Sequence, residues 1–319
     1  MATQTQKGKA FEYACLSALN EILGKNQEII IDETSAYETA KGFYESLDPK
    51  VVDKMDKAAR AASKILLKLE PQLENPDDNT PLFLQIQEDS KGIAGDVRDV
   101  VCIRKQNGWE IGLSCKHNHT AVKHSRLSYT IDFGAMWFDK ACSQDYFIEI
   151  EPIFTKLQEQ RERMLKWSQV MHKNDSVYVP LLNAFIEEIK RLDQEYPDEI
   201  PAQLIRYLLG RNDFYKVITQ DSKKLTTVQA YNLFGTLNKS SNKVKPMVKV
   251  HQLKLPTKFY DISYKDNSKN TIIVTCDGGW ALSFRIHNAS TNVEPSLKFD
   301  VQLIGVPQGL HTQIEPWEI

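Results

Sequence analysis

The dipeptide Asn107-Gly108, set between two short runs of strand-forming residues, constrains the fold more than any other feature of this sequence. Residues 99–105 and 109–116 are rich in Val, Ile, Cys and Trp, and Asn-Gly between such runs is the strongest local signal for a β-hairpin. A two-residue turn pairs Asp99 with Lys116 across the hairpin. The sequence therefore predicts an antiparallel pair of strands that holds a carboxylate and an ammonium on one face of a sheet.

This register depends on the length of the turn, because side chains alternate between the two faces of a strand. A three-residue turn would move Asp99 to the face opposite Lys116 and leave Asp96 as the better candidate. An Asp and a Lys that face each other across a hairpin are most often a surface ion pair of little energetic value. A functional interpretation therefore needs support from other parts of the chain.

The remaining elements follow from the spacing of apolar residues and from turn residues. Apolar residues from Phe11 to Leu23 recur on one helical face, and Gly24 ends that run. Further helices are predicted at 50–69, 148–172, 179–196 and 200–210, and further strands at 82–87, 271–276, 280–286 and 297–306. We expect an α/β (α+β) fold, with a mixed sheet flanked by helices over residues 1–150, then an α-rich middle and a C-terminal β region over 151–319.

Composition limits the class of protein. With 319 residues, 41% of them hydrophobic and 26% charged, the chain has the make-up of a globular protein rather than a disordered or fibrous one. The N-terminal residues lack the pattern of a signal peptide, and no run of about 18 apolar residues predicts a membrane span. The 5 cysteines are scattered without a C-x-x-C pair, which is typical of free thiols in a reducing compartment. We therefore expect a cytoplasmic protein that makes no contact with a membrane.

Charge is unevenly distributed, although the formal net charge is only −2. No acid occurs from Ser222 to Tyr260, a stretch that carries Lys223, Lys224, Lys239, Lys243, Lys245, Lys249, Lys254 and Lys258. The span 111–131 is likewise free of acids and holds His117, His119 and His124. Such local excesses suit the neutralisation of DNA phosphates, although a lysine run is more often a solvated face balanced by acids elsewhere.

The hairpin has the residues of a phosphodiester hydrolase. Mg²⁺ prefers oxygen ligands, so the Asp99 carboxylate and the backbone carbonyl of Cys115 would hold it beside a scissile phosphate. Lys116 would orient or help deprotonate the attacking water and offset charge in the transition state. An Asp on one strand and a Lys on the next form the skeleton of the PD-(D/E)XK nuclease site. In that pattern a second carboxylate belongs at the position that Ser114 occupies here.

The N-terminal helix supplies a candidate for the missing carboxylate. At about 100° per residue, Glu12 lies inside the apolar arc between Leu19 and Leu23. A carboxylate directed inward needs a partner, because burying it unpaired is costly. We therefore predict Glu12 as a second metal or water ligand, with Glu88 and Asp96 as the next candidates. The alternative is that Glu12 sits at the edge of the apolar face and reaches solvent.

Stretches in and beyond the hairpin share the pattern of one nuclease family. They are Gly95-Asp-Val-Arg-Asp-Val-Val, Trp109-Glu-Ile-Gly-Leu-Ser-Cys-Lys-His-Asn-His, Ile131-Asp-Phe-Gly, Tyr207-Leu-Leu-Gly and Asp277-Gly-Gly-Trp. Over nearly its whole length the chain resembles the HaeIII-type restriction endonucleases. The resemblance implies a PD-(D/E)XK nuclease core, Mg²⁺-dependent cleavage of double-stranded DNA at the palindrome GGCC, and a methyltransferase that protects host DNA. Asp99 and Lys116 match the family's catalytic Asp and Lys, whereas Ser114 departs from the general nuclease pattern.

Polar residues in two regions are candidates for contacts with DNA. After the hairpin they are His117, His119, Lys123, His124 and Arg126, and near the C-terminus they are Arg285, His287, Asn288, Ser290, Thr291, Asn292 and Lys298. Arg and Lys read guanine through N7 and O6, and acidic or amide groups can meet cytosine N4, so the second set suits a GC-rich site. Each set is otherwise an ordinary polar surface. A zinc site at Cys115 and the nearby histidines is a weak interpretation, because structural zinc usually gathers its ligands as pairs from separate elements.

The favoured hypothesis is an endonuclease that cuts both strands of a palindrome, which implies two active sites and hence a homodimer on DNA. The first alternative, supported by Ser114, is a DNA-binding protein that kept the nuclease fold and lost cleavage. The second is a repair or structure-specific nuclease that has the same active site but reads no sequence.

Overall fold

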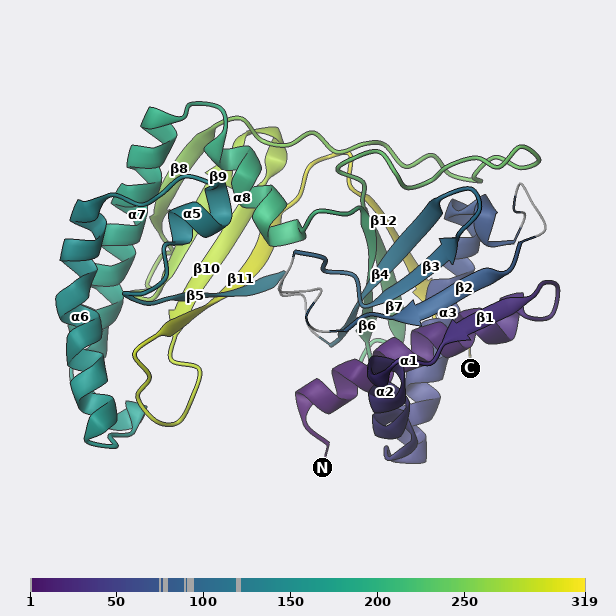
Figure 1. Cartoon of the computed structure of the whole chain (residues 1–319), viewed down its shortest axis with the longest axis horizontal. Helices are drawn as coiled ribbons and strands as arrows, with labels where there is room; N and C mark the ends of the chain where they lie inside the picture. The colour runs from purple at the N-terminus through teal and green to yellow at the C-terminus, as the bar shows by residue number, and fades with distance from the viewer. Residues whose placement is uncertain are drawn as a thin grey trace. The chain divides into compact units, whose positions relative to one another are not determined.

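The computed structural model describes residues 2–74, 76, 80–88, 90, 95–118 and 122–318, with the backbone alone at position 124. The chain forms two units that interleave along the sequence. The first unit comprises Met1–Thr120, Gly210–Leu253 and Gly309–Ile319, and the second comprises Ala121–Leu209 and Lys254–Gln308 (Figure 1). Each unit is built on its own β-sheet.

The sheet of the first unit is mixed. Its strand order is β1 (Ile29–Asp32), β2 (Leu82–Ile86), β3 (Val100–Arg104), β4 (Trp109–His117), β6 (Phe214–Gln220), β7 (Leu225–Tyr231) and β12 (His311–Pro316). β1 pairs with β2 and β4 pairs with β6 in parallel, whereas the other neighbours are antiparallel. The strands predicted around the hairpin are therefore confirmed as the central strands of this sheet.

Helices cover one face of this sheet. α1 (Gln4–Leu23) and α3 (Pro49–Leu69) pack against the strands, and α2 (Ser35–Glu45) packs on α1. Thr3 caps α1 in a capping box with Gln6, and this cap fixes where the helix begins. The core between helices and strands includes Phe11, Ile65 and Leu113. Because side chains alternate along a strand, Ser114 and Lys116 belong to the face opposite this core.

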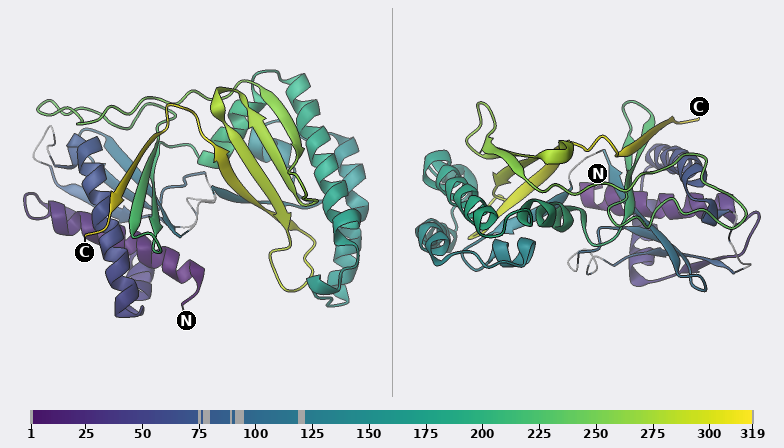
Figure 2. Two further views of the ribbon diagram at one scale, coloured as in Figure 1. Left: turned by 180° about the vertical axis from the view of Figure 1, so that it is seen from behind. Right: turned by 90° about the horizontal axis from the view of Figure 1, so that it is seen from above.

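The second unit is an antiparallel sheet with helices on one side. Its strand order is β5 (Lys123–Leu127), β11 (Leu297–Gly305), β10 (Ala281–His287), β9 (Thr271–Cys276) and β8 (Phe259–Tyr264). The helices α5 (Phe133–Phe138), α6 (Gln144–Glu162), α7 (Val179–Glu195) and α8 (Ile200–Leu209) lie on one side of it (Figure 2). Phe185 of α7 packs on Phe284 and Phe299, with ring centroids 6.1 and 5.0 Å apart. This aromatic core identifies the covered face of the sheet.

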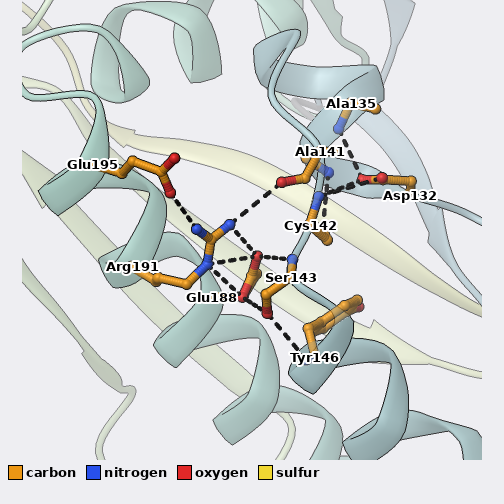
Figure 3. Close-up of polar contacts among 10 residues, drawn as sticks. Asp132, Ala135, Ala141, Cys142, Ser143, Tyr146, Glu188, Arg191 and Glu195 are labelled. Carbon is orange, nitrogen blue, oxygen red and sulfur yellow. Dashed lines mark hydrogen bonds and ion pairs between the residues drawn. The ribbon is translucent and has the colours of Figure 1, made fainter.

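A buried carboxylate ties α7 to the start of α6 (Figure 3). Glu188 of α7, which is 4% exposed, accepts hydrogen bonds from the backbone N–H and the hydroxyl of Ser143 at 2.7 and 2.8 Å. Arg191 donates to the same carboxylate at 2.8 Å and to the backbone carbonyl of Ala141 at 3.3 Å. Burial alone would raise the pKa of Glu188, but Arg191 and Ser143 hold it below its ordinary value. The connection into α6 is therefore fixed by charge-assisted hydrogen bonds.

Most predicted helices are confirmed, namely those that correspond to α1, α3, α7 and α8. The helix expected over 148–172 has different limits, because α6 begins at Gln144 and ends at Glu162. Met164 adopts a left-handed φ of 56°, a conformation that a helix cannot continue through. None of the described helices combines the length and the apolar character needed to cross a bilayer.

Candidate functional site

The hairpin between β3 and β4 has a longer loop than predicted. Arg104 lies opposite Trp109, which leaves residues 105–108 as the loop. The Asn107 side chain accepts a hydrogen bond from the Trp109 backbone N–H at 3.0 Å, and Gly108 adopts a φ of 65°. The two-residue turn is therefore wrong, because a side-chain contact from Asn107 closes a wider loop.

The wider loop shifts the register of the central Asp and Lys by two residues. β3 and β4 pair Val100 with Leu113, and the Asp99 N–H donates to the Leu113 carbonyl at 2.7 Å. Asp99 and Val100 thus both lie against Leu113, which places Asp99 at a bulge just before the regular ladder, and the predicted direct pairing of Asp99 with Lys116 is wrong. The alternation of faces along β3 therefore does not decide where the Asp99 side chain points, and its position is given by its own contacts with Lys116 and Cys115.

Asp99 and Lys116 contact each other diagonally across the hairpin. Lys116 Nζ lies 3.3 Å from Asp99 Oδ2, and the backbone N–H of Cys115 donates to the same oxygen at 2.6 Å. Among the described residues, no hydrogen bond reaches Asp99 Oδ1. Burial is the largest single influence and would lower the pKa of Lys116, but Asp99, Cys115 and Glu12 together outweigh it and raise the pKa above its ordinary value. The ammonium is therefore charged at neutral pH.

Glu12 lies close enough to Asp99 and Lys116 for its pKa to respond to their charges. These three residues are called the Asp99 cluster. Glu12 is 6% exposed on α1, and its Oε2 lies 3.2 Å from Lys9 Nζ. Burial is the main cause that raises the pKa of Glu12 to about 8; the negative charge of Asp99 adds to this, whereas Lys9 and Lys116 oppose it. The alternative that Glu12 reaches solvent is wrong. Two carboxylates and an ammonium predicted from the sequence thus lie within electrostatic reach of one another.

Asp96, one of the two further candidates for a metal or water ligand, forms an ion pair with Arg98. Arg98 Nε and Nη2 donate to the two oxygens of Asp96 at 2.8 and 2.7 Å, and Nη1 donates to Glu110 at 2.8 Å. Burial would raise the pKa of Asp96, but the Arg98 guanidinium holds it below its ordinary value. Asp96 is therefore already neutralised by an ion pair.

A groove of about 410 Å³ runs along this face of the sheet. Its lining includes Gln85, Gln87, Glu88, Asp96 and Arg98. Gln85 pairs with Val101 of β3, on the face that also carries Ser114 and Lys116. Glu88, the other carboxylate named as a candidate ligand, therefore lines a polar groove on the same face as Lys116.

Lys216 is a residue of this face that the sequence did not single out. It lies opposite Ser114 in the parallel pair of β4 and β6, so the two side chains share a face with Lys116. Lys216 is 5% exposed, and burial together with the positive charge of Lys116 lowers its pKa to about 7. The position where the general nuclease pattern has a carboxylate is therefore occupied by a serine beside a lysine.

His117 is buried rather than directed toward solvent. It is 4% exposed, its Nε2 lies 3.5 Å from Asp221 Oδ2, and its ring centroid lies 6.2 Å from that of Phe11. His119 and the side chain of His124 lie outside the described residues. In the part of the chain that the structure describes, no group of three or more His, Cys, Asp or Glu side chains is arranged to hold a metal ion. The zinc interpretation has no support there.

Predicted DNA contacts from two distant segments meet on one face of the second sheet. β5 pairs with β11 so that Arg126 lies opposite Lys298, and β11 pairs with β10 so that Lys298 lies opposite His287. Arg285 shares this face because it lies two residues before His287, and it is paired with Asp300. The reverse face is the aromatic core. The side of the sheet that faces away from α5, α6, α7 and α8 thus carries Arg126, Arg285, His287 and Lys298.

The residues after β10 form a loop held by its own polar groups. Asn288 Nδ2 donates to the Asn292 carbonyl at 2.8 Å, and Ser290 Oγ accepts from the Asn292 N–H at 3.1 Å. The Thr291 carbonyl accepts from the Trp167 N–H at 2.8 Å. Asn288 and Ser290 therefore shape the loop that follows the polar face.

The lysines of the two basic regions differ in their surroundings. Lys123 Nζ donates to the Tyr207 carbonyl at 2.9 Å and lies 3.7 Å from the centroid of the Tyr207 ring. The lysines of the acid-free stretch 222–260 are all exposed: Lys223, Lys224, Lys239, Lys243, Lys245, Lys249, Lys254 and Lys258. The second group is therefore placed to meet a polyanion, whereas Lys123 is engaged within its own unit.

Sequence comparisons with known proteins cover both units. The family model of the HaeIII restriction endonuclease matches residues 8–307. The type II restriction enzyme HaeIII of Haemophilus aegyptius is 47% identical over 311 residues, which cover 98% of this chain and 97% of that protein. No solved structure matches the chain. The family match includes the Asp99 cluster and the polar sheet face, and the chain therefore belongs to the HaeIII restriction endonuclease family.

Proposed function

We propose that this chain is a Mg²⁺-dependent type II restriction endonuclease that hydrolyses double-stranded DNA within GGCC. The observation that carries the proposal is the contact between Asp99 and Lys116 in a chain of this family. The buried Glu12 carboxylate lies within electrostatic reach of both side chains. The relative that is 47% identical is named a type II restriction enzyme, which supports site-specific rather than general cleavage.

The donors in the cluster suit Mg²⁺. This ion binds proteins through one or two carboxylates and keeps several waters, so it needs no larger set of side chains. Asp99 and Glu12 would hold it, and a cation between them would offset the cost of burying Glu12. The Cys115 carbonyl is a third donor, because the N–H and C=O of a strand residue point to the same side and this N–H is directed at Asp99. When bound, the ion supplies a Lewis acid for the phosphate and a more acidic water.

The lysines of this face act on the phosphate. Lys116 is charged and held in place by Asp99, so it can orient the attacking water and offset the negative charge that grows on the phosphate oxygens. Ser114 adds no negative charge at its position, and Lys216 lies beside it. This arrangement favours a phosphate over a second metal ion at that point.

DNA binding is divided between general and specific contacts. The exposed lysines of 222–260 would neutralise phosphates, and the polar face of the second sheet would read bases. Cleavage of both strands of a palindrome requires two copies of the chain related by the two-fold axis of the site. A methyltransferase of the same specificity would protect host DNA. All 5 cysteines are free, which supports a reducing, cytoplasmic location.

Digestion of an unmethylated plasmid of known sequence tests the proposal, with sequencing of the fragment ends. We expect Mg²⁺-dependent fragments that end within GGCC and no cleavage with EDTA. Asp99→Asn should abolish cleavage, whereas Asp53→Asn, at an exposed position of α3, should cut like the wild type. Tight binding to GGCC without cleavage would instead identify a binding protein, and cutting at every sequence would identify a repair-type nuclease.

A further inference from the structure

The polar face of the second sheet carries side chains in facing pairs. β10 and β11 place Ser283 opposite Gln302, Arg285 opposite Asp300, and His287 opposite Lys298. Successive same-face residues recur at about 6.8 Å along a strand, which is about two base-pair steps of DNA. Neighbouring facing pairs are therefore spaced to meet every second base pair.

The pair of Arg285 and Asp300 differs from its neighbours because it joins opposite charges. Arg285 Nη2 lies 3.1 Å from Asp300 Oδ2, and the two side chains are 56% and 15% exposed. In the part of the chain that the structure describes, this is the one hydrogen bond of the Arg285 guanidinium, which has five N–H donors. Because the Arg285 side chain is exposed and makes a single contact here, it can turn toward a ligand at a cost of about 0 to 1 kcal/mol.

These two side chains complement one G·C base pair. In the major groove guanine presents two acceptors, O6 and N7, and its paired cytosine presents a donor, the N4 amino group. An arginine supplies two parallel donors to guanine, and a carboxylate accepts from cytosine N4. At an A·T pair the arginine would meet the adenine N6 donor beside N7, and the carboxylate would face thymine O4, which is a second acceptor.

We infer that Arg285 and Asp300 read one G·C pair of the recognition sequence as a unit. Arg285 donates to guanine O6 and N7, and Asp300 accepts from the N4 amino group of the cytosine on the other strand. Arg126 and Lys298, which lie beside them on β5 and β11, then face the flanking phosphates. This inference rests on the proposed function, because it concerns which groups select GGCC.

A cycle that combines protein variants with base analogues tests the inference. Binding of the full chain to a GGCC duplex is measured in Ca²⁺, with cytosine replaced by 2-pyrimidinone, which lacks N4, or guanine replaced by 7-deazaguanine. We expect Asp300→Ala to weaken binding roughly 5- to 150-fold on the natural duplex and to have no further effect on the 2-pyrimidinone duplex. Arg285→Ala should weaken binding less on the 7-deazaguanine duplex than on the natural one, because only the contact with O6 is left to lose. Asp261→Ala, an exposed carboxylate on β8 of the same sheet, is the matched control and should change binding less than twofold.

Independent effects of the variant and the analogue would overturn the inference, as would an unchanged affinity of Asp300→Ala for the natural duplex. Thermal unfolding of each variant shows whether the sheet is intact. Asp300→Asn keeps the shape and one acceptor oxygen, so it should lose less affinity than Asp300→Ala. If the wild type itself does not distinguish GGCC from other sequences, the proposed function fails. If it does distinguish them and the cycle shows no coupling, only the role of this pair fails.

Discussion

A methyl group on Gly112 would lie 2.0 Å from Cδ of Arg98, because the Arg98 side chain crosses β4 directly over this glycine. This close approach lets Arg98 reach Asp96 at 2.7 Å and Glu110 at 2.8 Å. Gly112 is therefore needed for space rather than for an unusual backbone conformation. It lies between Glu110 and Ser114 on the face of β4 that also carries Lys116.

Gly112→Ala should displace Arg98 and disrupt its ion pairs. We expect a loss of about 1 to 3 kcal/mol in the free energy of unfolding, because the clash involves the stem of the side chain rather than its mobile end. Urea unfolding measures the effect. Gly42→Ala is the control, because no atom lies within 4 Å of a Cβ there and α2 should gain about 0.5 to 1 kcal/mol. A destabilisation of the same size in both variants would contradict this account.

Glu12→Gln should separate stability from activity. Burial is the main cause that raises the pKa of Glu12 to about 8, so a neutral amide should stabilise the fold by about 1 to 3 kcal/mol at neutral pH. Cleavage should fall by roughly 100-fold or more, because a donor of the proposed metal site is lost. Denaturation and single-turnover cleavage give the two readouts. Glu21→Gln, at an exposed position of the same helix, should alter neither. A variant that is less stable and fully active would argue for a structural Glu12.

Glu70 should make stability depend on pH. Burial is the main cause that raises the pKa of this fully buried carboxyl to about 7, although Tyr215 donates to it at 2.6 Å and the Asn238 N–H at 2.5 Å. The folded protein holds the Glu70 proton more tightly than the unfolded chain does. This contribution to stability is therefore complete below about pH 4.5 and is lost as the pH rises through about 7.

Urea unfolding of the wild type and of Glu70→Gln over this range checks the effect. We expect the free energy of unfolding of the wild type to fall, relative to the variant, by about 2 to 3 kcal/mol between about pH 5 and pH 8. Parallel curves for the two proteins would mean that Glu70 does not titrate in this range.

Glu188→Ala should loosen the second unit. The substitution removes the acceptor for Ser143 and leaves Arg191 without its main partner, so we expect a loss of about 2 to 3 kcal/mol. Thermal unfolding measures the change. Glu187→Ala, whose side chain is 71% exposed on the same helix, should shift stability by less than about 0.5 kcal/mol. Equal shifts for the two neighbours would mean that the Glu188 contacts contribute little.

The sequence predicted the hairpin and its neighbouring helices because their signals are local. The sequence did not give the register of β3 against β4. Asn107-Gly108 is compatible with a two-residue turn and with the wider loop that the Asn107 side chain closes here. The predicted contact between Asp99 and Lys116 survived this error because the two side chains meet diagonally across the hairpin. Glu12 could be predicted as buried because the spacing of apolar residues along a single helix places it between Leu19 and Leu23 on the apolar face.

Strands that pair far along the chain were not predictable from local patterns. β6 and β7 are buried on both faces over much of their length, so they lack a clear alternation, and Lys216 was overlooked with them. The pairing of β5 with β11 joins residues on either side of the helical middle, and no local spacing encodes it. It is this pairing that brings Arg126 to the face of Arg285 and Lys298.

The first sheet is completed only when the C-terminal strand β12 has been synthesised. The first sheet takes its edge strand β12 from the last segment of the sequence, and Trp317 is buried there with its indole N–H on Thr226 at 2.9 Å. Residues 254–308 belong to the other unit and must leave the ribosome before β12 does. A nascent or prematurely terminated chain therefore lacks part of the sheet that carries Asp99 and Lys116. We expect such fragments to leave the DNA of the cell that makes them uncut.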